Sequence, residues 1–180
     1  MPDALPYLLH FSEDPAITRF EPTVAPGSAM SAEPCVWAIA PERAPLYLFP
    51  RDCPRIGYWA KPTTSASDRY RFLSQTGARR VLVVESAWVS TLCSCELFAY
   101  RLPPDLFMPT GMDGYYTSKI AVTPLSVVPV GDLLEAITAD NNELRITPSL
   151  WELHDALQDS TLHFSTLRMR YAAPRADTMK

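Results

Sequence analysis

Proline is the residue type that most constrains this chain, because 18 of its 180 residues are proline and only 6 are glycine. Proline has no amide proton and a fixed backbone angle, so it is excluded from central strands and from helix interiors. The prolines are spread from residue 2 to residue 174 instead of being clustered in one linker. We therefore expect short helices and strands that are joined by stiff connections.

Hydrophobic residues make up 47% of the chain, which is enough to build a core at this length. We predict a single domain over residues 1–171, followed by a disordered tail at residues 172–180. The sequence pattern predicts more strands than helices, and the helices do not alternate regularly with the strands. The fold class that we expect is therefore α+β.

The expected strands are short apolar or β-branched runs at residues 7–11, 36–40, 56–60, 80–85, 96–102, 115–118, 120–130 and 143–147. The strands at 115–118 and 120–130 are expected to pair with each other, with Pro124 at a bulge or an edge. Helices are expected in a short segment that begins at Pro41, from residue 67 or 68 to 75, at 132–139, and from a capping box at Ser149 to residue 158.

Composition also limits the class of partner. The net charge of −4 argues against nucleic acid, because nucleic-acid binding depends on Lys and Arg side chains that neutralise phosphates. No apolar run is long enough to span a membrane. The four cysteines come without an export signal and without zinc-site spacing, so we expect reduced thiols, a cytoplasmic protein and no metal.

The segment at residues 8–15 ends an apolar run with His10, Ser12 and two carboxylates. Titratable side chains at the end of a buried strand indicate a site, and we take His10 and Ser12 as candidate ligand-binding residues. The alternative is structural: His10 donates to a main-chain carbonyl, and Ser12 caps the amides of an ordinary turn. Both interpretations stay open at this point.

A second unusual segment, residues 49–55, contains two prolines and two arginines. A stiff loop that displays Arg51 and Arg55 suits carboxylate or phosphate ligands, because a guanidinium group can bind two oxygens at once. An internal Arg–Asp pair that holds the loop is the alternative. Cys53, which lies between the prolines, is a candidate nucleophile only if a base and a cation activate its thiol.

Three further candidates lie later in the chain. Tyr116 and Ser118 follow a loop with two glycines, and they either line a ligand cleft or form a strand with one buried face. Arg145 shares one side of a strand with Glu143, where a surface ion pair is the simplest arrangement. The ligand-site hypothesis predicts that these side chains meet the two earlier segments in one pocket.

Several short segments of this sequence resemble those of an uncharacterised family of small proteins. The resemblance is carried by HFSEDP and FPRDCPR, and it extends over residues 7–171. No activity is assigned to that family, so this resemblance implies no function.

The order of the expected elements more distantly resembles the ADP-ribosyltransferase-like fold, a split antiparallel or mixed β core with a few short helices. In that superfamily a first-strand histidine contacts the ribose of NAD, an aromatic residue stacks on nicotinamide, and a late glutamate holds a ribose hydroxyl. The resemblance implies His10 as the ribose contact and Tyr47 as the stacking residue. The glutamate is missing from residues 114–118, and Glu143 comes too late in the chain order.

The leading hypothesis is therefore a protein that binds NAD, a nucleotide or another phosphate-bearing small molecule, similar to an ADP-ribosyltransferase without the usual catalytic glutamate. The alternative is a non-catalytic interaction module that covers the surface of another protein. A thiol-dependent hydrolase that uses Cys53 and His10 is the third hypothesis. The sequence assigns no catalytic residue and no oligomeric state.

Overall fold

The computed structural model describes residues 5–24 and 33–175. The chain divides into two compact units, and each unit has a sheet and a core of its own. Unit 1 is Met1–Leu48 with Glu96–Gly131, and unit 2 is Phe49–Cys95 with Asp132–Lys180. This division describes packing, so the single domain that the sequence suggests stays a prediction.

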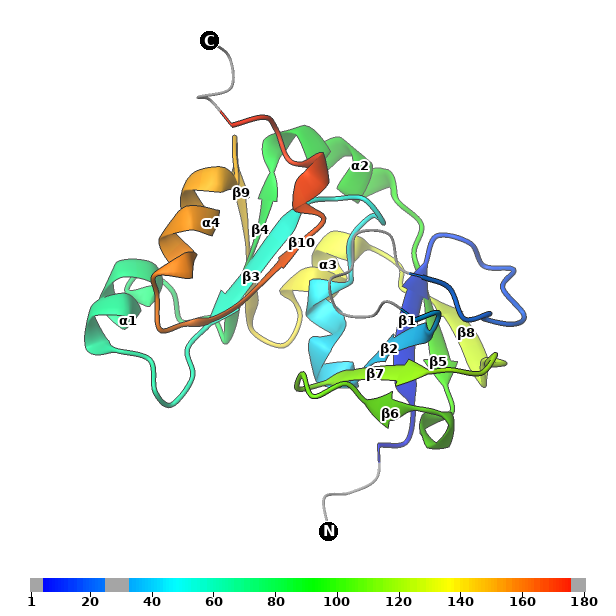
Figure 1. The fold of residues 1–180 in the computed structure, drawn as a ribbon. Helices are drawn as coiled ribbons and strands as arrows, with labels where there is room; N and C mark the ends of the chain where they lie inside the picture. The colour runs from blue at the N-terminus through cyan, green and yellow to red at the C-terminus, as the bar shows by residue number, and fades with distance from the viewer. Residues whose placement is uncertain (1–4, 25–32, 176–180) are drawn as a thin grey trace. The chain divides into compact units, whose positions relative to one another are not determined.

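Unit 1 is built on an antiparallel sheet with the strand order β6-β7-β2-β1-β5-β8 (Figure 1). Its core lies on one face of this sheet, where Leu8, Val36 and Tyr100 pack with Phe20 and Val122. Phe20 and Val122 come from connections and pair in an isolated antiparallel bridge. The strands are β1 (Leu8–Ser12), β2 (Val36–Ile39), β5 (Phe98–Leu102), β6 (Met108–Pro109), β7 (Tyr115–Ser118) and β8 (Ser126–Pro129).

Unit 2 contains a mixed sheet with the order β10-β3-β4-β9, in which β4 and β9 are parallel. Its strands are β3 (Arg55–Trp59), β4 (Arg80–Glu85), β9 (Asn142–Thr147) and β10 (His163–Leu167). Its α-helices are α1 (Ala66–Leu73), α2 (Val89–Ser94), α3 (Leu133–Thr138) and α4 (Trp151–Gln158).

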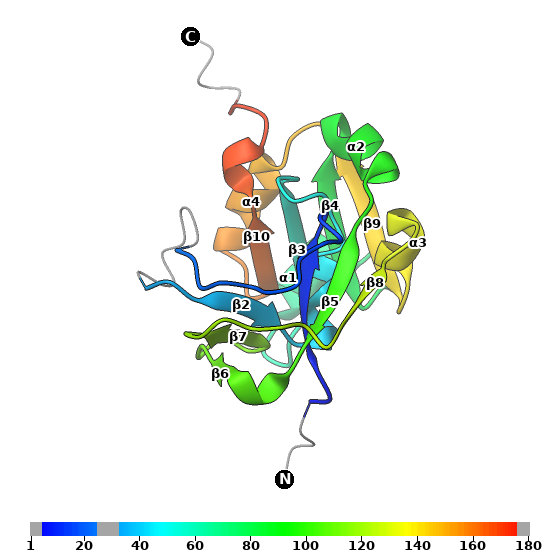
Figure 2. The same cartoon turned by 90° about the vertical axis from the view of Figure 1, so that its right-hand side faces the viewer.

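One face of the unit 2 sheet is covered by α1 and α4. Phe72 of α1 and Leu157 of α4 pack into the same core as Tyr58 and Val81 of the sheet. Figure 2 shows α3 beside β9, on the other side of the strands from α4.

The prolines occupy the positions that their chemistry allows. Among the strands of the described residues, β6 and β8 contain proline, at Pro109 and Pro129, and these two strands are the edges of the unit 1 sheet. The α-helices of the same residues contain no proline, whereas the 3-10 helix η1 (Pro41–Leu46) begins with Pro41. The other 3-10 helices are η2 (Ser86–Trp88), η3 (Pro104–Leu106) and η4 (Met169–Tyr171).

The α+β class is confirmed, but several local predictions are wrong. The strands β7 and β8 do not pair with each other, since β7 lies between β6 and β2 while β8 pairs with β5. Helix α1 begins earlier than expected because Ser65 caps it: the Ser65 hydroxyl accepts the Asp68 amide proton at 3.1 Å. The sequence analysis missed α2 and β10 altogether.

The start of the predicted tail is held on unit 2. The Glu85 carboxylate accepts the Ala173 amide proton at 2.9 Å, and the Trp151 indole donates to the Ala173 carbonyl at 2.6 Å. Arg175 binds Asp155 through two hydrogen bonds of 2.6 and 3.0 Å. Residues 172–175 therefore contact unit 2, residues 176–180 lie outside the described residues, and the disordered tail stays a prediction.

Candidate functional site

His10 lies on β1, where the pairing between β1 and β2 ends. The two strands pair at Leu9 and Ile39. Beyond this pair, the His10 side chain forms the next hydrogen bond between the strands, with Nδ1 2.8 Å from the Trp37 carbonyl. A carbonyl only accepts, so Nδ1 carries the proton. The His10 ring packs on Phe20, with ring centroids 4.7 Å apart. These contacts agree with the structural interpretation of His10.

Ser12 and its neighbours form a turn that is closed by side chains. The Ser12 hydroxyl accepts the Asp14 amide proton at 3.1 Å, and the Asp14 carboxylate accepts the Ala16 amide proton at 2.8 Å. The hydroxyl of Tyr100 donates to the Asp14 carbonyl at 2.7 Å and accepts the Ile17 amide proton at 3.1 Å. The polar residues of HFSEDP therefore build this turn, which is the capping role that an Ser/Asp-rich turn favours.

Tyr116 and Ser118 of β7 lie on the same face of the unit 1 sheet as its core. Tyr116 pairs with Ala38 and packs against the core. Ser118 is 2% exposed, and its hydroxyl donates to the Ile120 carbonyl at 3.1 Å. Because residues that pair across neighbouring strands share a face, His10 lies on this face as well, opposite Tyr100. The structure thus places these candidates on a face that is largely filled by packing.

In unit 2, the FPRDCPR segment forms a tight turn at residues 50–53. The Cys53 amide donates to the Pro50 carbonyl at 3.0 Å, so the turn is closed by the main chain. The Cys53 thiol is buried, and burial raises its pKa to about 12, more than the nearby Arg55 guanidinium lowers it. Cys53 is therefore a thiol without the activation that the hydrolase hypothesis requires.

Arg55 and Arg51 have different roles in this segment. Arg55 is 4% exposed, donates to the Cys53 carbonyl at 2.9 Å, and lies 5.3 Å from the centroid of the Phe49 ring. Arg51 is exposed at the corner of the turn. Nε of Arg168 donates to the Arg51 carbonyl at 2.9 Å, which brings a second guanidinium group to the turn.

Arg168 immediately precedes η4, which lies beside the start of β3 in Figure 1. Its φ of 58° is left-handed, a conformation that is rare for residues other than glycine, asparagine and aspartate. Such backbone strain tends to occur at functional sites. We call residues 50–53 together with Arg168 the arginine turn. The sequence analysis missed Arg168, because neither its backbone angle nor its contact with residue 51 can be seen in the sequence.

Arg145 is part of a different network. Its Nε donates to Glu143 at 2.6 Å, and its Nη1 donates to the Tyr58 hydroxyl at 2.9 Å. The Arg145 guanidinium holds the pKa of Glu143 below its usual value, so Glu143 stays ionised. The surface ion pair that the sequence suggested for Glu143 and Arg145, on one side of this strand, is therefore present.

The unit 2 sheet separates Arg145 from Arg55. Arg145 of β9 pairs with Val83 of β4, which in turn pairs with Ile56 of β3, whereas Arg55 of β3 pairs with Val84. Successive residues of a strand face opposite sides, so the Arg55 and Arg145 side chains project from opposite faces. The predicted pocket also draws on both units, and it stays a prediction.

In residues 5–24 and 33–175, no three His, Cys, Asp or Glu side chains are grouped so that they could hold a metal ion. In the same residues, none of the helices combines the length and the apolar character that crossing a membrane requires.

Comparison with known proteins gives a family but no activity. Residues 9–172 match the model of DUF6886, a family of unknown function, and this match includes all of HFSEDP and all of FPRDCPR. No curated protein and no solved structure matches the chain, so the ADP-ribosyltransferase-like fold is not shown. Because the family match extends over most of the sequence, the chain belongs to the family of unknown function DUF6886.

Proposed function

We propose that this protein binds a phosphate-bearing small molecule, such as a nucleotide or NAD, at the arginine turn of unit 2. The observation that carries the proposal is the hydrogen bond from Arg168 to the Arg51 carbonyl, which brings the Arg168 guanidinium to the turn that carries the exposed Arg51. Guanidinium groups bind phosphate oxygens in pairs, and two of them on a rigid support lose little entropy when the ligand binds.

The construction of the turn supports this role. The main chain closes the turn through the hydrogen bond from Cys53 to Pro50, and the buried Cys53 and Phe49 anchor it. Arg168 keeps a left-handed backbone next to it. Both features favour a segment whose side chains serve recognition.

The ligand class rests on chemistry and on the resemblance described above. Two arginines on one turn suit a phosphate, and the resemblance to the ADP-ribosyltransferase-like order of elements implies a nucleotide. The Cys53 thiol of the arginine turn is not activated, and Glu143 is committed to Arg145. We therefore propose binding, and we assign no catalysed reaction to this turn.

Calorimetric titration of the full chain with ADP-ribose, AMP and inorganic phosphate tests the proposal. We expect Arg51→Gln and Arg168→Gly each to weaken binding of the nucleotides by about tenfold. Glycine adopts the left-handed backbone of residue 168 without strain, so Arg168→Gly removes the guanidinium group and keeps the turn. The matched control is Arg19→Gln, which removes an exposed arginine that pairs with Glu21 in unit 1.

Two outcomes would overturn the proposal. The first is a wild-type protein that binds none of the three compounds. The second is nucleotide binding that both variants retain at wild-type affinity while their melting temperatures are unchanged.

Protein interaction is the second candidate function, and strand β8 favours it. Val127 and Val128 are 42% and 38% exposed on consecutive positions of this edge strand, and Leu125 before it is 61% exposed. Edge strands with apolar side chains are templates for pairing with another chain. If β8 is used in this way, the full chain associates in light scattering and Val127→Lys abolishes the association. This second function is contradicted if the wild-type protein stays monomeric and a pull-down with it recovers no partner.

A further inference from the structure

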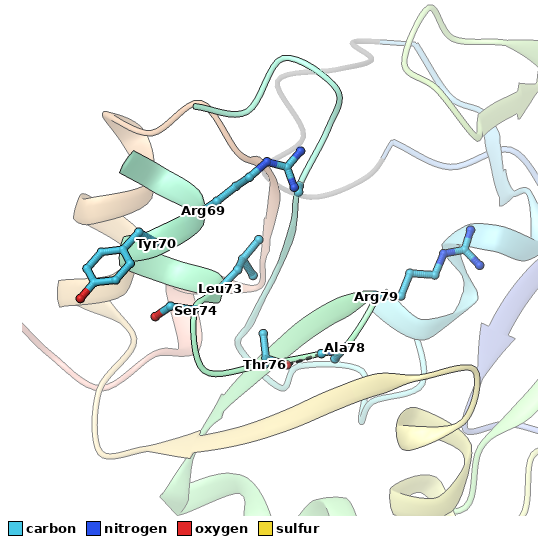
Figure 3. A pocket seen from close by; sticks show the side chains of 9 residues that line it. Arg69, Tyr70, Leu73, Ser74, Thr76, Ala78 and Arg79 are labelled. Atoms are coloured by element: carbon cyan, nitrogen blue, oxygen red, sulfur yellow. Dashed lines mark hydrogen bonds between the residues drawn. The ribbon is translucent and has the colours of Figure 1, made fainter. Parts of the chain in front are cut away.

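We propose that unit 2 has a second ligand site, a cavity at the C-terminal end of α1 that binds a small organic anion. The cavity has a volume of about 470 Å³ and lies between α1 and the segment at residues 74–79 (Figure 3). Ala60, which directly follows β3, is in its wall, whereas the arginine turn precedes β3. The two sites are therefore separated by the length of β3, on the order of 15 Å.

Two arginines give the cavity its positive charge. Arg69 comes from α1 and Arg79 from the residue just before β4, and both are exposed. A hydrogen bond of 3.1 Å from Arg69 to the Lys61 carbonyl restrains the Arg69 guanidinium. In Figure 3 the Arg69 side chain extends from α1 and the Arg79 side chain from the end of the segment at residues 74–79, while Tyr70 projects from the other side of α1. In a chain with a net charge of −4, this pair forms a local site for an anion.

The segment that carries Arg79 is held in place before any ligand binds. The Thr76 hydroxyl accepts the Ala78 amide proton at 2.9 Å. Asn141 contacts the segment twice: its side-chain amide donates to the Gly77 carbonyl at 2.9 Å, and its carbonyl accepts the Arg79 amide proton at 2.7 Å. Such preorganisation reduces the entropy that binding costs.

One carboxylate lies next to the cavity, and its charge is already balanced. Glu143 contacts the Thr76 side chain, but its carboxylate is 2.6 Å from Nε of Arg145. The Arg145 guanidinium thus compensates the charge that would otherwise repel an anion.

The remaining wall defines the ligand class. Leu73 and Ala78 provide apolar surface in this wall. Small-molecule sites have volumes of about 300–1,000 Å³ and combine apolar walls with a few polar groups. The ligand that fits is an oxyanion, either a carboxylate or a phosphate, on a compact apolar or aromatic body.

Titration of the full chain with benzoate, phenyl phosphate and inorganic phosphate, followed by amide NMR, tests this site. We expect both organic anions to shift the Gly77 and Ala78 amide signals. The anion that binds with the higher affinity shows whether the site prefers a carboxylate or a phosphate. Inorganic phosphate, which has no apolar body, should bind at least several-fold more weakly. Arg69→Gln and Arg79→Gln should each weaken binding by about tenfold.

Arg71→Gln is the matched control, because Arg71 is an exposed arginine of α1 that lies 4.9 Å from the Phe72 ring and is not part of the cavity wall. Its binding should equal that of the wild type, and Arg51→Gln should leave the Gly77 and Ala78 shifts intact. The proposal is overturned if neither organic anion shifts these signals, or if Arg69→Gln and Arg79→Gln bind as the wild type does. Equal affinity for inorganic phosphate would contradict the apolar part of the site.

Discussion

The HFSEDP turn of unit 1 and the arginine turn of unit 2 look alike in the sequence but are built in opposite ways. In HFSEDP, the side chains of Ser12 and Asp14 and the hydroxyl of Tyr100 make the hydrogen bonds that close the turn. In the arginine turn, the main chain of Pro50 and Cys53 closes the turn.

This difference separates polar residues that hold a turn from polar residues that a turn displays. A side chain that satisfies buried or local amides has little capacity left for a ligand, whereas a turn closed by its own main chain can present any side chain at its corner. The comparison therefore directs the search for a ligand to Arg51 and Arg168, and it assigns HFSEDP a structural role.

The largest expected effect concerns Cys53, the buried anchor of the arginine turn. Burial raises the pKa of its thiol from 9.0 to about 12, which lowers its thiolate fraction at pH 8 by about a thousandfold. We expect iodoacetamide to label Cys53 far more slowly than the exposed Cys93 of the same chain, as measured by mass spectrometry. If Cys53 is labelled at the same rate as Cys93, the arginine turn is open, and the contrast between the two turns is contradicted.

The next effect is on the HFSEDP turn. Tyr100→Phe removes the hydroxyl that bridges the Asp14 carbonyl and the Ile17 amide, so we expect the free energy of unfolding to fall by about 1–3 kcal/mol. Urea denaturation measures the change. Tyr70→Phe is the control, since the Tyr70 side chain is 79% exposed. If both variants are equally stable, the Tyr100 hydroxyl does not hold the turn.

The smallest effect compares one side chain from each turn. Ser12→Ala removes the acceptor of the Asp14 amide proton, and we expect it to destabilise the protein by about 0.5–1 kcal/mol. Arg51→Gln alters a displayed side chain, so its effect on the free energy of unfolding should stay within about 0.5 kcal/mol. The two variants are compared in the same urea titration, and a larger loss for Arg51→Gln would reverse the assignment of roles.

Much of the fold could be predicted from local sequence. The runs in β1 and β4 are mostly apolar or β-branched, β9 alternates polar and apolar residues, and the prolines of β6 and β8 lie in edge strands, where proline is tolerated. Strand β10 was missed because its sequence, HFSTL, is only partly apolar and pairs with a strand about 100 residues earlier in the chain. The pairing of β7 and β8 was wrong because adjacency in sequence suggested a hairpin, whereas β8 completes its hydrogen bonds with β5.

The candidate site was less predictable, for a physical reason. The sequence predicted a stiff loop with two arginines at residues 49–55, and the structure has a turn at residues 50–53, but Arg55 already belongs to β3 and is buried. It could not reveal that Arg55 is buried over Phe49, that Arg145 lies on the other face of the sheet, or that Arg168 reaches the turn. These facts depend on strand register and on a contact between residues far apart in the chain.

The most direct test of the central claim is an amide NMR titration of the full chain with AMP. The account predicts that the largest shifts fall on residues 51–53 and on Arg168, and that Arg168→Gly abolishes most of them. Shifts that centre instead on His10 and Ser12, and that Arg168→Gly leaves unchanged, would contradict it.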